Sequence, residues 1–275
     1  MRSFVGKIIS FINQKGGVGK TTMAFNAAHA LAKNGHKVLA IDLDPQSNLT
    51  LLFKANNELN IYHLLINSVK ELKMLHAPAM LGNVISKGQV DLLPAGQELS
   101  GFDLTIAAIN APRQLVLKKF IETNGLNDRY DFIIIDCPPT LGLLVINALC
   151  ASDGVIVPFR PDDFSLKGLE HFYQVIEDIK EMGIVKAPEI FLHVPNLVDL
   201  RRKQESDDLN KIISAIDATL GAGKVFSPFL NKAGLVKSLS SRKSVFDFKT
   251  QEFSDLQEKF NGVAQRIEDW SNEHI

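Results

Sequence analysis

The chain has 275 residues, of which 45% are hydrophobic and 22% are charged, and its formal net charge is −1. This composition suits a globular fold with a large core, and it excludes a polycation that would bind nucleic acid by overall charge. No apolar run approaches the ~20 residues that cross a bilayer, and residues 1–7 lack a signal peptide's long apolar core. The two cysteines, Cys137 and Cys150, are too few for a disulfide framework and predict a reducing, cytoplasmic setting.

The first predicted elements are a strand, a glycine-rich loop and a helix. Apolar residues 8–12 predict a buried strand, and helical spacing begins at Met23 and stops at Gly35, a good residue to end a helix. The N–H groups of such a loop and the positive end of the helix converge on an anion. The sequence therefore predicts a phosphate-binding loop made of Lys15, Gly16, Gly17, Val18, Gly19, Lys20, Thr21 and Thr22.

The residue types in this loop match phosphate chemistry. Its three glycines allow the backbone to curl where a Cβ would collide with phosphate oxygens. Lys20 can reach the β- and γ-phosphates, and the hydroxyl of Thr21 suits Mg²⁺. The usual pattern G-x-x-x-x-G-K-[ST] is met loosely, because Gln14 replaces its first glycine and a second lysine, Lys15, stands at the entrance of the loop.

Strands and helices alternate along the rest of the chain. Strands are predicted at 38–41, 90–94, 132–136, 155–157 and 190–194, and helices at 48–53, 61–66, 112–122, 165–181, 206–220 and 254–270. Segment 70–87 fits no clear element. Strand–helix–strand units are right-handed and give a parallel sheet with helices on both faces. We expect one α/β domain over residues 1–275, with a mostly parallel twisted sheet of the P-loop type.

Two aspartates are expected at the carboxyl edge of this sheet, where ligands of open parallel sheets gather. Asp136 ends the strand at 132–136, and Asp44 follows the strand at 38–41, kept out of the next helix by Pro45. Asp136 and Asp44, with Thr21, are the candidate Mg²⁺ ligands, and Asp44 could also orient an attacking water. Either carboxylate could instead cap a helix or form a turn, and Asp42 is expected to make only structural contacts.

Basic residues gather in the C-terminal part of the chain. Residues 201–249 contain ten Lys or Arg against five Asp or Glu, in a chain whose net charge is −1. This asymmetry indicates either a surface that attracts phosphate backbones or a solvated basic face. Phosphate contacts add affinity without reading sequence. The candidates for DNA contact are Arg201, Arg202, Lys203, Lys237, Arg242 and Lys243.

Three motifs resemble those of one family. K-G-G-V-G-K-T-T at 15–22 resembles the deviant Walker A box of the ParA/MinD ATPases, D-L-D-P-Q-S-N-L-T at 42–50 resembles switch I of ParA proteins, and residues 136–142 resemble switch II. The likeness covers residues 7–156 and continues more faintly to the C-terminus. It implies a P-loop ATPase of the ParA/Soj type that binds ATP or ADP with Mg²⁺ and has a weak intrinsic rate of hydrolysis.

The resemblance also implies roles for single residues. Lys15 would cross a dimer interface to touch the partner's nucleotide, Asp44 would support hydrolysis, and with Lys20 these residues form the expected catalytic set. Asn196 and Pro228 match positions that lie near the adenine in relatives, although residues 197–201 differ from the sequence that is usual in the family. The preference for ATP over GTP rests on this resemblance.

The partners implied by the resemblance are a second copy in the ATP state, non-specific DNA, and a ParB-like protein that triggers hydrolysis and release. The expected setting is the nucleoid of a prokaryotic cytoplasm, without stable membrane association. The cargo could be a plasmid, a chromosome or a protein assembly. No helix-turn-helix precedes the first strand, so an operator-reading role is not expected.

Two other classes of function remain as alternatives. A MinD-like protein that cycles on a membrane would need a C-terminal amphipathic helix with basic flanks, but residues 251–275 contain six acids against two basic residues. A metabolic P-loop enzyme could be a carboxylate-activating ligase, whose substrate pocket the sequence does not reveal, or an iron–sulfur reductase. The reductase would need cysteines paired about a dimer axis, whereas Cys150 is expected in a helix core. A tyrosine-kinase relative is disfavoured because the tail has no tyrosine cluster.

Overall fold

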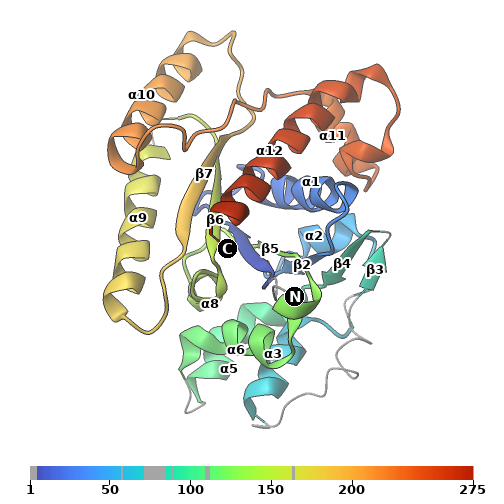
Figure 1. Cartoon of the computed structure of the whole chain (residues 1–275), viewed down its shortest axis with the longest axis vertical. Coiled ribbons are helices and arrows are strands. Elements are labelled where there is room, and N and C mark those ends of the chain that lie inside the picture. The colour runs from blue at the N-terminus through green and yellow to red at the C-terminus, as the bar shows by residue number, and fades with distance from the viewer. Residues whose placement is uncertain are drawn as a thin grey trace.

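The computed structural model describes residues 5–56, 58–70, 85–87, 89–108, 112–162 and 165–274. Its centre is a seven-stranded sheet with the order β3-β4-β2-β5-β1-β6-β7 (Figure 1). Six neighbouring strands run parallel, and only β3 at the edge is antiparallel. The strands are β1 Lys7–Phe11, β2 Val38–Asp42, β3 Ile85–Lys87, β4 Val90–Leu93, β5 Phe132–Asp136, β6 Gly154–Phe159 and β7 Glu189–Pro195.

Helices cover both faces of the sheet (Figure 1). One core joins the sheet to α1 Lys20–Lys33, α2 Asn48–Leu52, α11 Ala233–Ser240 and α12 Ser254–Glu273. The other core joins it to α3 Ile61–Lys70, α5 Phe102–Ala107, α6 Val116–Thr123, α7 Leu126–Arg129, α8 Leu143–Ala151, α9 Ser165–Met182 and α10 Lys203–Leu220. Every residue of β2, β5 and β6 is buried, as expected for parallel strands between two helical layers. The predicted α/β class and parallel sheet are confirmed.

Several boundaries differ from the sequence expectation. The helix predicted from Pro112 starts later, because residues 113–115 form a 3₁₀ turn before α6, and α10 begins at Lys203 rather than near residue 206. The short helices α5 and α11 and the edge strand β3 were not predicted, since elements of three to eight residues show little periodicity. Most of the unassigned segment 70–87 lies outside the described residues.

The strand register explains where a site can form. Phe11 of β1 pairs with Asp136 of β5, which in turn pairs with Asp42 of β2. The carboxyl ends of three adjacent strands therefore lie side by side. The loop that follows β1, the turn that follows β5 and the segment that follows β2 all leave the sheet at this edge, where parallel sheets bind ligands.

Candidate functional site

A cavity of about 650 Å³ opens at this edge of the sheet, directly over the loop between β1 and α1. Its lining joins segments far apart in the sequence: the loop, the residues after β2, the residues after β7, and α11. Of the residues proposed from the sequence, the lining includes Gly16, Gly17, Gly19, Lys20, Thr21, Thr22, Asp44, Asn196 and Arg242. The volume lies within the roughly 300–1,000 Å³ that small-molecule sites occupy.

The loop backbone requires glycine at two positions. Gly17 has a φ of 74° and Gly19 a φ of 93°, a region that other residues rarely adopt. A Cβ on Gly19 would also lie 2.2 Å from Asn196 Nδ2. Asn196 donates a hydrogen bond from Nδ2 to the Val18 carbonyl oxygen at 2.8 Å, which ties the loop to the end of β7. Val18 itself is buried beneath the loop.

The N-terminus of α1 is open toward the cavity. Gly19 occupies the N-cap position, no side chain caps the helix, and no acidic residue stands in its first turn. The first N–H groups of a helix have no partner within the helix, and they carry its positive partial charge. The loop and helix end therefore present backbone donors that suit phosphate. The predicted binding of phosphate by these residues stays a prediction.

Lys20 adds a buried positive charge at the same place. Its side chain is almost fully buried, and Nζ lies 3.3 Å from the Lys15 carbonyl oxygen, to which it donates a hydrogen bond. Burial lowers the pKa of this ammonium, while the negative charges of Asp136 and Asp44 oppose that shift. A cation held between a phosphate-binding loop and two carboxylates can neutralise an anionic ligand.

Asp136 is a buried carboxylate whose negative charge destabilises the fold when no ligand is bound. It is completely buried, and among the described residues neither carboxylate oxygen has a hydrogen-bond partner. Burial raises the pKa of Asp136 well above its usual value, and the negative charge of Asp42 adds to this effect. Thr21 and Lys20 lie near enough to oppose the shift, but Thr21 does not meet hydrogen-bond geometry with the carboxylate. A buried, unpartnered carboxylate is stabilised when a cation binds beside it.

The cation that this arrangement fits is Mg²⁺. Asp136 and Asp44 offer hard oxygen ligands, and Thr21 offers a hydroxyl at the start of α1. The described residues contain no cluster of three or more His, Cys, Asp or Glu side chains that could hold a metal. Mg²⁺ is usually held by one or two carboxylates together with phosphates and water, so this small donor set agrees with it.

The two switch-like aspartates differ in their contacts. Asp42 accepts hydrogen bonds from the Thr50 backbone N–H at 2.8 Å, the Thr50 hydroxyl at 2.7 Å and the Asp44 N–H at 3.1 Å. Those three bonds are what a structural carboxylate makes. Asp44 accepts one bond, from the Gln46 N–H at 2.9 Å, and borders the cavity. The expected catalytic role of Asp44 stays a prediction.

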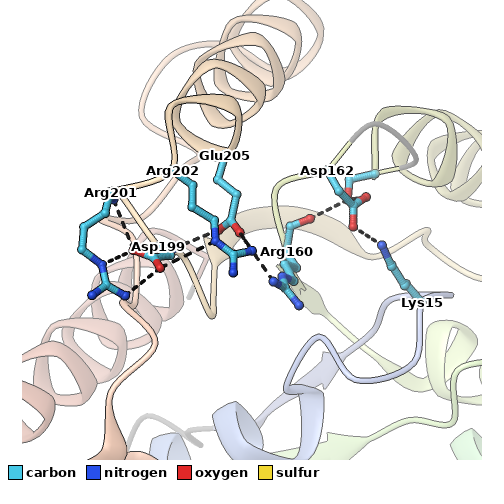
Figure 2. Close-up of polar contacts among 8 residues, drawn as sticks. Lys15, Arg160, Asp162, Asp199, Arg201, Arg202 and Glu205 are labelled. Carbon is cyan, nitrogen blue, oxygen red and sulfur yellow. Dashed lines mark hydrogen bonds and ion pairs between the residues drawn. The ribbon is translucent and has the colours of Figure 1, made fainter.

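Lys15 does not point into the cavity of its own chain. Its ammonium forms an ion pair with Asp162, just before α9, and its side chain is 42% exposed (Figure 2). Among the described residues the cavity lining does not include Lys15. The predicted contact between Lys15 and a nucleotide therefore depends on a second copy of the chain and stays a prediction.

The adenine assignments of Asn196 and Pro228 stay predictions. Asn196 lines the cavity, and its Oδ1 atom is buried without a partner among the described residues. Pro228 lies outside that lining within the described chain, so its expected place near the base stays a prediction. Sequence reasoning missed the contribution of α11 to the cavity, through Leu235, Val236 and Leu239. Their apolar spacing at i, i+1 and i+4 was the available signal.

Half of the basic candidates for DNA contact are already ion-paired. Arg201 binds Asp199 through two bonds of 2.8 Å, and Arg202 lies 3.3 Å from a Glu205 oxygen (Figure 2). Elsewhere on the chain, Lys237 lies 2.7 Å from Glu252. The basic side chains of these pairs are exposed, and exposed pairs contribute little and are readily exchanged. The remaining candidates are Lys203 and Lys243, which are exposed, and Arg242, which lines the cavity.

Comparison with known proteins places the chain in a family. A family model described as an AAA domain matches residues 6–188. The chromosome-partitioning ATPase Soj of Treponema pallidum is 38% identical over 231 residues, which cover 82% of this chain and 83% of that protein.

Solved structures share the fold over nearly the whole chain. The structure of apo McdA from Cyanothece has a TM-score of 0.79 at 23% identity and covers 95% of this chain and 99% of its own. Cobyrinic acid a,c-diamide synthase of Mycobacterium smegmatis, with a bound ATP analogue and magnesium, has a TM-score of 0.75 at 27% identity and covers 95% and 93%. With its P-loop, its switch-like aspartates and the relatives above, this chain belongs to the ParA/Soj family of P-loop ATPases.

Proposed function

We propose that residues 1–275 act as one Mg²⁺-dependent ATPase domain that binds ATP and ADP in the cavity over the P-loop. The observation that carries the proposal is the buried, unpartnered carboxylate of Asp136 beside Lys20 and the open end of α1. A solved structure 27% identical to the chain holds an ATP analogue and magnesium, which supports the same ligands here.

Each residue of the site has a part in phosphoryl transfer. The loop N–H groups and Lys20 would bind the phosphates, and Thr21, Asp44 and Asp136 would hold Mg²⁺, which would neutralise part of the phosphate charge. Asp44 borders the cavity and forms one hydrogen bond to the backbone, which supports a role in orienting the attacking water. Asp136 is completely buried, which keeps bulk water from its charge.

We propose further that ATP joins two copies of the chain. Lys15 is half-exposed and lies outside its own cavity, so it is available to a partner. Two apolar residues that border the cavity are also exposed, Leu51 by 48% and Val236 by 58%. Exposed apolar residues around a ligand cavity favour a protein interface there. We propose that a second copy covers these residues and places its own Lys15 near the nucleotide.

The ATP dimer is proposed to bind DNA non-specifically and to leave it when a ParB-like partner stimulates hydrolysis. The similarity to a chromosome-partitioning ATPase of Treponema pallidum supports this function. Exposed Arg201, Lys203 and Lys243 can supply phosphate contacts. The setting would be the nucleoid of a prokaryotic cytoplasm, and the cargo a plasmid, a chromosome or a protein assembly.

The C-terminal helix argues against the membrane-cycling alternative. Within the described chain, no helix is both long enough and apolar enough to cross a membrane. The apolar face of α12 is not free, because it packs against the sheet and α1 through Phe260, Val263, Ile267 and Trp270. A membrane-bound helix would need this face free.

A carboxylate-activating ligase is the second candidate, because one similar solved structure is a diamide synthase. The reductase alternative gains no support, since Cys137 and Cys150 are both buried. One titration separates the ATPase functions: DNA retention measured with ATP, with ADP and without nucleotide, at two salt concentrations. We expect retention on arbitrary DNA only with ATP, and weaker retention at the higher salt. Retention that did not depend on nucleotide would contradict the proposed switch.

A further inference from the structure

A second cavity, of about 510 Å³, lies between α9 and α10 beside β7, and within the described chain it shares no lining residue with the cavity at the P-loop. Figure 1 shows these two helices together at one side of the molecule. On α9 the lining runs from Leu166 to Glu177 at helical spacing, which is about 16 Å at the usual helical rise. The cavity is therefore an elongated groove, which we call the α9–α10 groove.

The floor of this groove is apolar, and contacts with neighbouring residues hold it in place. Ile176, Ile190 and Ile216 form the base, each at most 9% exposed, while Leu166 and Leu220 are half-buried along the sides. The Tyr173 ring is held in place by a hydrogen bond of 2.8 Å between its hydroxyl and Nε2 of buried His193. Leu166, Tyr173 and Leu220 keep part of their apolar surface accessible, and another segment could bury that surface.

The rim of the groove is acidic. Glu170 and Glu177 stand at exposed positions of α9, and Glu170 forms no ion pair with any described residue. Glu177 meets Lys180 at 3.2 Å in an exposed pair of little strength. At the far end Glu189 is neutralised by Lys224 at 2.6 Å. No charged residue of α10 lines the described groove, so Glu170 and Glu177 set its charge.

Acidic residues outnumber lysines on both α9 and α10. Each has four Asp or Glu against two Lys, whereas the whole chain has a net charge of −1. Acidic walls repel nucleic acid and acidic peptides and attract basic ones. An apolar floor between acidic walls is complementary to a helix that has an apolar stripe flanked by Lys or Arg.

We propose that the α9–α10 groove binds an amphipathic, basic helix of a partner protein. The apolar stripe of that helix fills the space over Ile176 and Ile216, and its Lys or Arg side chains pair with Glu170 and Glu177. Three turns of helix match the length of the groove. This docking site lies outside the nucleotide cavity and goes beyond the function proposed above.

The test uses a synthetic 18-residue peptide with a leucine stripe flanked by lysines, labelled with a fluorophore, and the full chain without nucleotide. We expect saturable binding by anisotropy at physiological salt. Glu170→Lys combined with Glu177→Lys should weaken it by about tenfold, because two attractions become repulsions. Glu181→Lys is the matched control, since Glu181 is an exposed acid of the same helix outside the groove lining, and it should change the affinity less than about twofold.

Equal losses in the control and in the double variant would mean general attraction to an acidic helix, and would overturn the proposal. So would equally tight binding of a peptide whose lysines are replaced by glutamate. Methyl NMR of the wild-type chain gives a readout that needs no variant. We expect shifts at Ile176, Ile190 and Ile216, and shifts confined to Leu51 and Leu235 at the other cavity would contradict the proposed site.

A second copy of this chain is the remaining occupant to test. Sedimentation of the nucleotide-free chain at several concentrations should show a monomer, both in the wild type and in the Glu170→Lys, Glu177→Lys variant. A wild-type dimer that the double variant disrupts would assign the groove to self-association and overturn the proposal. Failure of peptide binding leaves the ATP-dependent DNA retention untouched, because the two experiments use different probes and different surfaces.

Discussion

Charged residues cluster both at the edge of the sheet near the P-loop and at the start of α10. The first cluster is buried and partly unpaired, whereas the basic residues of the second are exposed and paired. At the P-loop, Lys20 and Asp136 are buried, and neither oxygen of Asp136 has a partner among the described residues. At the start of α10, Arg201 and Arg202 are exposed and paired with Asp199 and Glu205 (Figure 2).

The difference shows which charges require a ligand. A buried charge without a partner costs several kcal/mol, so the fold keeps it only where something binds. Exposed pairs contribute about 0–1 kcal/mol and can exchange their partners for phosphate at little cost. Single substitutions at the P-loop should therefore change ligand binding strongly, and substitutions at the start of α10 should change it only weakly.

The largest effect is expected from Lys20→Ala. Removal of a buried cation that contacts phosphates should weaken ATP binding by at least ~100-fold. Calorimetric titration of ATP measures this loss. Lys37→Ala, which removes an exposed lysine at the start of β2, is the control and should bind ATP normally. An unchanged affinity in the Lys20 variant would remove its phosphate role.

Asp136→Asn should have opposite effects on stability and on binding. Without nucleotide, the variant should be more stable by about 1–3 kcal/mol, because it no longer buries an unpartnered charge. Its Mg²⁺-dependent gain in ATP affinity should fall by about 10- to 100-fold, as for other groups at metal sites. Denaturant unfolding and ATP titration with and without Mg²⁺ measure the two effects. A destabilised variant would contradict the conclusion that Asp136 is a buried charge without a partner.

The same substitution should change the pH dependence of stability. Because the pKa of Asp136 is raised in the folded state, the folded chain binds more protons than the unfolded chain above about pH 4. The wild type without nucleotide should therefore lose stability as the pH rises from there toward the raised pKa. Asp136→Asn should flatten this decrease in unfolding experiments across pH.

Lys15→Ala should separate dimerisation from nucleotide binding. The ion pair between Lys15 and Asp162 is partly exposed, so its loss should cost less than about 1 kcal/mol of stability. ATP binding should largely persist, while the ATP-dependent dimer should weaken by at least ~10-fold. Sedimentation with a slowly hydrolysed ATP analogue measures the dimer. A variant that dimerised like the wild type would show that Lys15 does not reach the partner.

The smallest effect is expected where the charges are exposed. Replacement of Arg201, Arg202 and Lys203 by alanine should weaken DNA binding by several-fold, equally for all sequences, and reduce the salt slope by up to about 2.7. Titrations at several salt concentrations give both quantities. A loss that depended on the DNA sequence would point to base contacts instead of phosphate contacts.

Much of the fold and part of the site could be predicted because the signals are local. The buried strands at 132–136 and 155–157 are continuous apolar runs, and the glycines of the loop follow directly from the backbone that a phosphate cradle requires. Three short elements, α5, α11 and β3, could not be predicted in this way. Helix α11 has eight residues and its stability comes from packing, so sequence reasoning missed the apolar wall that it adds to the cavity.

The sequence by itself determined the family's motifs, the parallel α/β architecture and the residue types that can bind phosphate and Mg²⁺. Only the tertiary structure decided which of them meet: it joined Asn196 to the loop, buried Asp136 without a partner, and turned Lys15 toward Asp162. Local patterns specify backbone and periodicity, whereas burial and pairing depend on contacts between residues far apart in the chain. The α9–α10 groove has the same origin, because its two walls come from different helices that the sheet brings together.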